Sequence, residues 1–288
     1  MHIQTFSIVI GTKVCNAHCP FCISKQTGFF GTPVNINWRN FAIACKLAQK
    51  ADTTTVLLTG KGEPTLYPSH VTETLKELQP YNFPLIEIQT NGLTIASGER
   101  VTDDVLRRWY DLGLTTIAIS VVHWDAARNK EIYCPGDTHF NLAAVIAKLR
   151  GIGFSVRIGV MLLNGFIDSP ATVQQMINFC KKNDVTQLTF RNITTSVVTS
   201  NASVTEWTKD HAIGNLLGGA IAQYIQTHGT LLQHLMHGMD VYDMDGQNVC
   251  LGNALTHDAN QANDFRQLIF FPDGSLYWDW QFKGARIL

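Results

Sequence analysis

Three cysteines lie within eight residues, Cys15, Cys19 and Cys22, in the sequence CNAHCPFC. They follow directly on the apolar run FSIVIG (residues 6–11), which is typical of a buried β-strand. Three thiols at the end of one strand can ligate a metal, and a metal centre with only three protein ligands keeps a coordination position open for chemistry. The spacing therefore predicts a metal centre that takes part in a reaction.

Polar side chains also follow five further predicted strands, at the point where each strand ends. The strands are residues 54–59, 85–90, 115–122, 154–163 and 187–192. In the same order, they end in Gly62-Glu63-Pro64, in Thr90-Asn91-Gly92, in His123 with Asp125, in Asn164, and in Arg191. The carboxyl ends of parallel strands meet at one edge of a sheet, where the chemistry of such folds takes place. We therefore expect these residues to converge on the cysteine loop.

Helical segments separate these strands and must position their ends. Helical periodicity occurs in residues 37–48, 69–78, 102–112, 140–151 and 171–182. Six strands that alternate with helices at intervals of about 30 residues predict an α/β fold, a partial (β/α)6 TIM-like barrel. Cys45 falls on the apolar face of the first helix together with Phe41, which favours a core position for this thiol.

The pattern changes after residue 192, and we divide the chain into a barrel domain, residues 1–200, and a small C-terminal α+β extension, residues 201–288. A long helix is predicted for residues 207–228. The run LIFFPDGSLYW (residues 268–278) predicts a β-hairpin around the turn PDG. We expect this helix and this hairpin to close the mouth of the barrel.

The composition is that of an ordinary globular protein. Its 288 residues are 45% hydrophobic and 16% charged, which argues against disorder. The net charge of −1 gives no general attraction to nucleic acid or to anionic lipid. No apolar run of about 18 residues is present and residues 1–5 lack a charged leader, so we predict a cytoplasmic protein with no membrane partner. The odd number of seven cysteines favours a reducing compartment with free thiols.

The spacing CxxxCxxC, with Phe21 before the last cysteine, resembles the signature of the radical S-adenosylmethionine (radical SAM) superfamily. The resemblance implies that Cys15, Cys19 and Cys22 hold three irons of a [4Fe–4S] cluster, while S-adenosylmethionine chelates the fourth iron. It also implies that the reduced cluster cleaves S-adenosylmethionine and that the resulting 5′-deoxyadenosyl radical abstracts hydrogen from a substrate. An external one-electron reductant of the flavodoxin or ferredoxin type would supply the electron.

The same resemblance implies further contacts with the cofactor, over residues 5–192. The sequence Gly62-Glu63-Pro64 resembles the Gly-Gly-Glu-Pro motif of the family, although Lys61 stands where a glycine is usual. The Glu63 carboxylate and the backbone beside it are expected to receive the methionine ammonium group. Other expected cofactor contacts are Thr90, Asn91, Ser120, Asn164 and Arg191.

Two other interpretations of the cysteines remain open on the sequence alone. The three thiols and His18 could form a structural zinc site in an interaction module without catalysis, although His18 directly precedes a ligand, which strains the geometry. Cys19 and Cys22 could form a thioredoxin-type dithiol, which would leave Cys15 and the repeated strands and helices without a role.

Cys250 is the candidate catalytic residue in the C-terminal part. The sequence Cys250-Leu251-Gly252, followed by the predicted hairpin, resembles the start of an extension that binds an auxiliary cluster, but the second cysteine is replaced by YWDW (residues 277–280). A single thiol can instead return a hydrogen atom to a substrate radical, as in the neomycin-type radical SAM epimerases of antibiotic biosynthesis, which the chain resembles. Cys134 is a competing loop thiol, and Cys250 could also be a buried apolar residue.

The substrate is expected to be polar. Candidate contacts are His123, Asp125, Glu206, Asp243 and Asp279. The late carboxylates favour a cationic substrate such as an amino sugar, although Asp243 and Asp245 could equally form a solvated turn. The alternative activity is that of a dehydrogenase, a mutase or a bond-forming enzyme on a peptide or nucleotide-derived substrate, with Cys250 structural.

Overall fold

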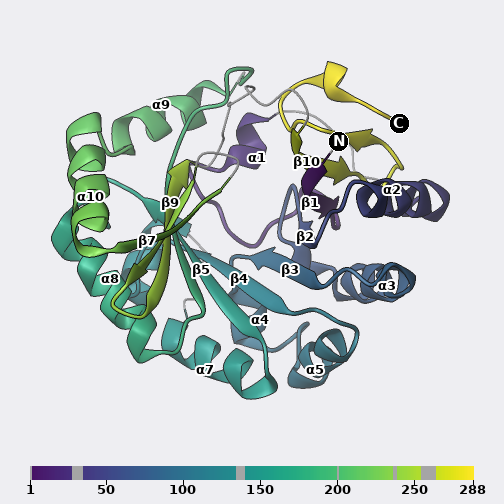
Figure 1. Cartoon of the computed structure of the whole chain (residues 1–288), viewed down its shortest axis with the longest axis horizontal. Helices are drawn as coiled ribbons and strands as arrows, with labels where there is room; N and C mark the ends of the chain where they lie inside the picture. Colours follow the sequence, from purple (N-terminus) through teal and green to yellow (C-terminus); the bar gives the residue numbers. More distant parts are fainter. Residues whose placement is uncertain (1, 28–34, 134–139, 200, 236–238, 254–263) are drawn as a thin grey trace.

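One curved sheet of 11 strands organises the molecule, in the order β11-β10-β1-β2-β3-β4-β5-β6-β9-β8-β7 (Figure 1). The computed structural model describes residues 2–27, 35–133, 140–199, 201–235, 239–253 and 264–288. Six parallel strands form its centre: β1 (His2–Val9), β2 (Thr55–Thr59), β3 (Leu85–Thr90), β4 (Thr116–Val121), β5 (Ser155–Leu162) and β6 (Gln187–Asn192). The sheet has two free ends, so the expected partial barrel is confirmed and it is not closed.

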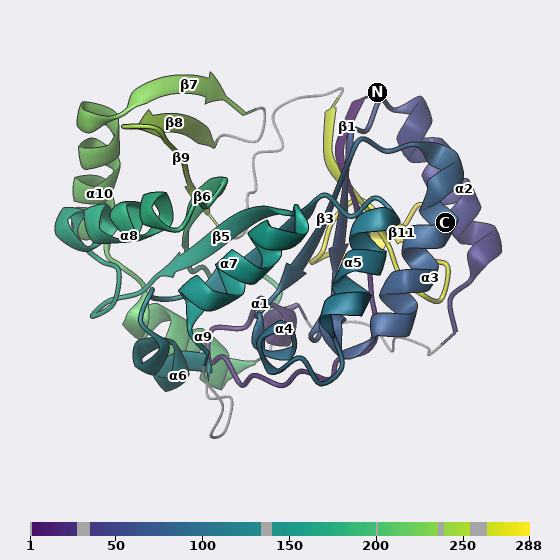
Figure 2. The ribbon, with the colours of Figure 1, turned by 90° about the horizontal axis from the view of Figure 1, so that it is seen from below.

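Helices connect the parallel strands and cover the outer side of the sheet (Figures 1 and 2). The long ones are α2 (Trp38–Lys50), α3 (Pro68–Leu78), α5 (Asp103–Asp111), α7 (Leu142–Ile152) and α8 (Pro170–Lys182). Short helices and turns are α1 (Ile23–Gln26), α4 (Leu93–Ser97), α6 (Ala126–Tyr133), η1 (Pro64–Leu66), η2 (Gln79–Tyr81) and η3 (Lys283–Ala285). The side chains of Asn37, Thr102, Asn141 and Ser169 cap α2, α5, α7 and α8, which explains where these helices begin. Within the described residues, no helix combines the length and the apolar character that crossing a bilayer requires.

The hydrophobic core lies between the outer face of the sheet and these helices. Alternate strand residues such as Ile86, Ile88 and Ile158 are buried there. Successive side chains of a strand point to opposite faces, so the residues between them, such as Glu87 and Arg157, face the inner side of the barrel. The strand pattern therefore gathers polar residues on the inner face.

The residues after 200 lengthen the sheet at both of its edges. β9 (Gln247–Asn253) pairs parallel with β6, and β8 (Asp240–Met244) and β7 (Thr230–His234) continue the sheet antiparallel. At the opposite edge, β10 (Asp264–Phe270) pairs parallel with β1 and antiparallel with β11 (Leu276–Tyr277). Figure 2 shows β7 and β8 far from β1 and β11. The predicted hairpin is confirmed, and the extension also supplies parallel strands to the barrel.

The prediction of one long helix over residues 207–228 is wrong. The segment forms two helices, α9 (Ala202–His211) and α10 (Asn215–His228). Between them, Ala212 makes an isolated β-bridge with Leu163, directly after β5, and Gly214 begins α10. The tertiary contact with Leu163 interrupts a helical periodicity that is otherwise continuous.

Candidate active site

The three cysteines occupy the loop between β1 and α1, at the carboxyl end of β1. Cys15, Cys19 and Cys22 are free thiols, each half-buried. Burial raises the pKa of Cys19, and the neighbouring Cys22 and Cys15 raise it further. Burial is also the main cause that raises the pKa of Cys15. Bound metal supplies the positive charge that converts such thiols into thiolates, so the three residues suit iron ligation.

The surroundings of Cys15 fit a cluster ligand. In the part of the chain that the structure describes, no three His, Cys, Asp or Glu side chains converge as the ligands of one metal ion do. The ligands of a four-iron cluster bind different irons, so they stand further apart. Two donors point at Cys15 Sγ, the backbone N–H of Ala17 at 3.4 Å and Nδ2 of Asn91 at 3.7 Å. Such N–H···S contacts stabilise sulfur that carries negative charge, as a cluster ligand does.

Two elements hold the cysteine loop in place. From the end of β3, Asn91 donates through Nδ2 to Asn16 Oδ1 at 2.8 Å. From the last residue of α6, the Tyr133 carbonyl accepts a hydrogen bond from the His18 N–H at 2.8 Å. The ring of Phe21 packs against the edge of Tyr133, with 6.3 Å between the centroids. The ends of β3 and α6 therefore determine where the cluster would sit.

The Glu63 carboxylate joins the turn after β2 to the end of β3. Its Oε1 accepts hydrogen bonds from the Thr65 N–H at 3.0 Å and from the hydroxyls of Thr65 and Thr90 at 2.7 Å each. Its Oε2 accepts the Asn91 N–H at 2.9 Å. Burial raises the pKa of this carboxyl, and the four hydrogen bonds oppose the rise. The protein's own donors occupy most of the hydrogen-bonding capacity of the Glu63 carboxylate. A contact with the cofactor ammonium would therefore use the remaining lone pair of Oε2.

Gly62 and Lys61 lie where this turn meets the cysteine loop. A Cβ on Gly62 would stand 2.0 Å from the Val14 carbonyl oxygen, so only glycine allows the approach. Lys61 is 7% exposed and donates through Nζ to the carbonyl and the hydroxyl of Thr27, at 3.1 and 2.8 Å. Its Nζ lies 5.4 Å from the centroid of the Trp280 ring, and burial lowers the pKa of Lys61 to about 8. The residue that departs from the family motif thus links the end of α1 to the C-terminal segment.

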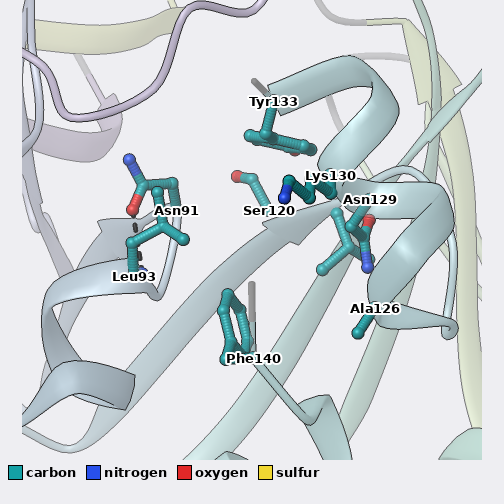
Figure 3. Close-up of a pocket in the computed structure, with 9 residues that line it drawn as sticks. Asn91, Leu93, Ser120, Ala126, Asn129, Lys130, Tyr133 and Phe140 are labelled. Atoms are coloured by element: carbon teal, nitrogen blue, oxygen red, sulfur yellow. Dashed lines mark hydrogen bonds between the residues drawn. The ribbon is translucent and has the colours of Figure 1, made fainter. Parts of the chain in front are cut away.

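A small cavity opens beside these residues (Figure 3). It is lined by Asn91, Leu93, Ser120, Val121, Ala126, Asn129, Lys130, Tyr133 and Phe140. The Lys130 side chain extends from α6 toward Ser120 and Asn91 (Figure 3). The Tyr133 phenol is buried, and burial together with the nearby thiols raises its pKa well above the usual value. Lys130 and Tyr133 were not predicted from the sequence, although both follow the predicted end of β4.

Cys250 and Arg191 lie on the inner face of two neighbouring strands. Cys250 of β9 is in register with Thr189 of β6, and Arg191 is in register with Gly252. The Cys250 side chain is 8% exposed. Burial raises the pKa of Cys250 to about 11, although the positive charges of Arg191 and Arg157 lower it. The sulfur therefore keeps its hydrogen at neutral pH.

Three of the remaining predicted residues lie at the ends of strands but take part in local structure. His123 accepts the Asp125 N–H through Nδ1 at 3.0 Å, and burial lowers the pKa of His123. Asp125 accepts backbone N–H groups of the first turn of α6. Asn164 is exposed, and its N–H donates to the His211 carbonyl at 2.9 Å. The competing thiol Cys134 lies outside the described residues.

The late carboxylates, expected near a cationic substrate, are engaged elsewhere. Asp243 accepts a backbone N–H in the turn between β8 and β9, and Asp245 pairs with Lys181 on α8. Asp279 accepts two backbone N–H groups of the residues that follow it. Glu206 lies on the exposed side of α9. The structure therefore does not bring these carboxylates together.

Residues 9–180 match the family described as the Radical SAM superfamily. The chain belongs to this superfamily. Its members use a [4Fe–4S] cluster and S-adenosylmethionine, act on a substrate and receive an electron from a reductant. No curated protein matches the chain. The family favours the cluster over the zinc site and the dithiol as the role of the cysteine motif.

Solved structures of three proteins have a similar fold. SuiB of Streptococcus suis bound to precursor peptide SuiA has a TM-score of 0.64 and 14% identity, over 100% of this chain and 62% of SuiB. The protein anSMEcpe with bound AdoMet has a TM-score of 0.60 and 13% identity, over 98% of this chain and 76% of that one. Methylornithine synthase (PylB) has a TM-score of 0.57 and 13% identity, over 91% and 75%. At these identities the likeness shows the fold alone, and the chain spans about three fifths of the length of SuiB.

Proposed function

We propose that this radical SAM enzyme epimerises a polar substrate, with Cys250 as the hydrogen donor. The position of Cys250 carries the proposal, because its thiol lies on the inner face of β9, beside β6 and next to the charge of Arg191. A hydrogen-atom donor must hold its hydrogen, and the pKa of about 11 keeps Cys250 protonated at neutral pH.

The residues that would hold the cofactor lie on the other side of the inner face. Cys15, Cys19 and Cys22 would ligate the cluster, and the free capacity of Glu63 Oε2 would meet the ammonium group. The cavity beside Asn91 offers the Lys130 ammonium and the Ser120 hydroxyl, a pair suited to the cofactor carboxylate. When bound, the cofactor supplies a 5′-deoxyadenosyl radical that removes one hydrogen atom from the substrate.

Cys250 would then complete the inversion. Its S–H bond breaks homolytically, the hydrogen atom forms a C–H bond on the opposite face of the substrate carbon, and a thiyl radical remains on sulfur. One electron from the flavodoxin- or ferredoxin-type reductant and one proton from solvent restore the thiol. The substrate is thus neither oxidised nor reduced overall, which distinguishes epimerisation from dehydrogenation.

The proposed reaction fits more than one class of substrate. An amino sugar satisfies the requirement for a polar molecule, but the carboxylates that would favour it do not surround Cys250. A peptide or nucleotide-derived substrate, with Cys250 structural, is the alternative, and SuiB shows that a chain of this fold binds a peptide.

Solvent deuterium tests the role of Cys250. The reconstituted enzyme, turned over in D2O, is expected to place deuterium on one inverted carbon, because a thiol exchanges its hydrogen with solvent. Cys250→Ala should form 5′-deoxyadenosine but release no inverted product, and Cys180→Ala, which changes a fully buried thiol of α8, should behave as wild type. Inversion with deuterium in Cys250→Ala would refute the proposal, and an oxidised product would favour the dehydrogenase.

A further inference from the structure

The inner face of the sheet gathers more positive than negative charge around Cys250. Glu87 of β3, Arg157 of β5 and Arg191 of β6 occupy strand positions between residues of the outer core. The charge of Arg266, on β10, also acts on Arg191 and lowers its pKa. Three guanidinium groups therefore face one carboxylate.

The single carboxylate of this group is already engaged. Glu87 forms an ion pair with Arg157, and the exposed fractions of the two side chains are 7% and 21%. Gln89 also donates through Nε2 to the same Glu87 oxygen, at 3.2 Å. Asp240 of β8, whose charge acts on Cys250, accepts a hydrogen bond from the His234 ring at 2.6 Å. Both carboxylates therefore already have partners within the protein.

The Arg191 guanidinium is unpaired among the residues that the structure describes. Within the described residues, its guanidinium makes no hydrogen bond and no ion pair, and its charged neighbours are those just named together with Cys250. Burial, together with the charges of Arg157 and Arg266, lowers the pKa of Arg191 to about 10. Arginine stays charged at this pKa, so the half-buried guanidinium is a donor group that a bound anion can pair with.

The residue in register with Arg191 on β5 is Met161, and small side chains occupy the preceding inward-facing positions. Thr189 precedes it by one inward-facing position on β6, and Gly159 is in register with Thr189 on β5. A Cβ on Gly159 would meet only the Ile119 carbonyl oxygen, at 3.9 Å, so the glycine does not serve close packing. The planar fork of donors of an arginine binds carboxylate or phosphate with two parallel hydrogen bonds.

We propose that the substrate carries an anionic group, a carboxylate or a phosphate, which binds to Arg191 with support from Arg266 and so places the reacting carbon beside Cys250. The proposal rests on the proposed function, since it names the substrate class of the same site. It changes the expectation of a purely cationic substrate: an amino sugar would bind here only if it also carries an acidic group.

Binding of simple anions tests the proposal. The probes are inorganic phosphate and glutarate, titrated by calorimetry into the reconstituted enzyme saturated with S-adenosylmethionine, with glucosamine as the cationic control. At least one anion should bind, and which of the two binds more tightly separates a phosphate from a carboxylate. Arg191→Gln should weaken that binding by at least about tenfold, and Arg191→Lys by less, because lysine keeps the charge but loses the fork.

The control variant is Arg107→Gln on α5, whose side chain is 60% exposed, and it should bind the anion as wild type. Anion binding that Arg191→Gln leaves unchanged, or tighter binding of glucosamine than of both anions, would overturn the proposal. Loss of S-adenosylmethionine binding in Arg191→Gln would assign this arginine to the cofactor and would also overturn it. Circular dichroism of both Arg191 variants separates unfolding from loss of the site.

The failure of this inference is distinguishable from the failure of the proposed function. Formation of 5′-deoxyadenosine and deuterium incorporation report on the reaction without any anion probe. If both occur in the wild type while anions bind no better to it than to Arg191→Gln, only the anionic substrate is refuted. If Cys250→Ala still inverts its substrate, the donor role fails regardless of the titrations.

Discussion

The cofactor side and the substrate side of the inner face differ in how their polar groups are matched. On the cofactor side, formed by the cysteine loop, the turn after β2 and the end of β3, Glu63 alone accepts four hydrogen bonds and Asn91 joins three segments. On the substrate side, formed by β5, β6 and β9, Arg191 has no acceptor among the described residues. Hydrogen bonds within the protein tie the first side together, whereas Arg191 on the second side has no such bond among the described residues.

We infer from this difference that the substrate side determines substrate specificity. All radical SAM enzymes bind the same cofactor, so its site can be rigid and satisfied by the protein's own groups. Substrates differ, and a buried charge that only a ligand can pair selects one class of substrate at a cost in stability. Three variants with matched controls test this comparison, in order of decreasing expected effect.

Removal of one cluster ligand should abolish activity and leave the fold. Cys19→Ala is expected to lose the iron–sulfur absorbance and all 5′-deoxyadenosine formation, because two thiolates do not retain a cluster that needs three. Cys45→Ala, which changes a buried thiol of α2, should keep both. Iron analysis and product chromatography provide the measurements. Full iron content in Cys19→Ala would mean that the cofactor side is not built on these three cysteines.

Removal of the Glu63 carboxylate should destabilise the fold. Glu63→Ala leaves the donors of Thr65, Thr90 and Asn91 without an acceptor, which should lower the free energy of unfolding by about 3 kcal/mol. The exposed Glu77→Ala on α3 should change it by less than about 0.5 kcal/mol. Urea denaturation of the apo protein measures both. Equal stability of the two variants would show that the network on the cofactor side is not what holds its segments together.

Removal of Arg191 should cost little stability or none. The free energy of unfolding of Arg191→Met is expected to lie within about 1 kcal/mol of that of the wild type, or above it. The substitution removes a charge that has no acceptor among the described residues. Arg157→Met leaves Glu87 buried without its partner and should lose about 3 kcal/mol. The same urea titrations compare the two arginines of one face. A loss in Arg191→Met as large as in Arg157→Met would mean that Arg191 is matched within the protein.

Much of the fold follows from periodicity, and the exceptions have physical causes. The six parallel strands and their helices alternate regularly, because each strand is followed by a helix that covers it. The parallel pairing of β9 with β6 and of β10 with β1 has no local signature, since both partners are distant in sequence. The break between α9 and α10 depends on the contact of Ala212 with Leu163, which periodicity does not record.

Residues that are close together in the sequence form the cofactor side, whereas the tertiary structure brings together the residues of the substrate side. CxxxCxxC and Gly62-Glu63-Pro64 are contiguous, and their function depends on the spacing of ligands along one loop, so the sequence alone identified the cluster and the superfamily. Glu87, Arg157, Arg191 and Cys250 come from four strands and meet only because those strands share one face of the sheet. The late carboxylates of the sequence favoured a cationic substrate, because carboxylates pair with ammonium groups. The fold disperses those carboxylates into turns and a helix surface and leaves an arginine beside Cys250, because register and strand alternation, not distance in sequence, determine which charges meet.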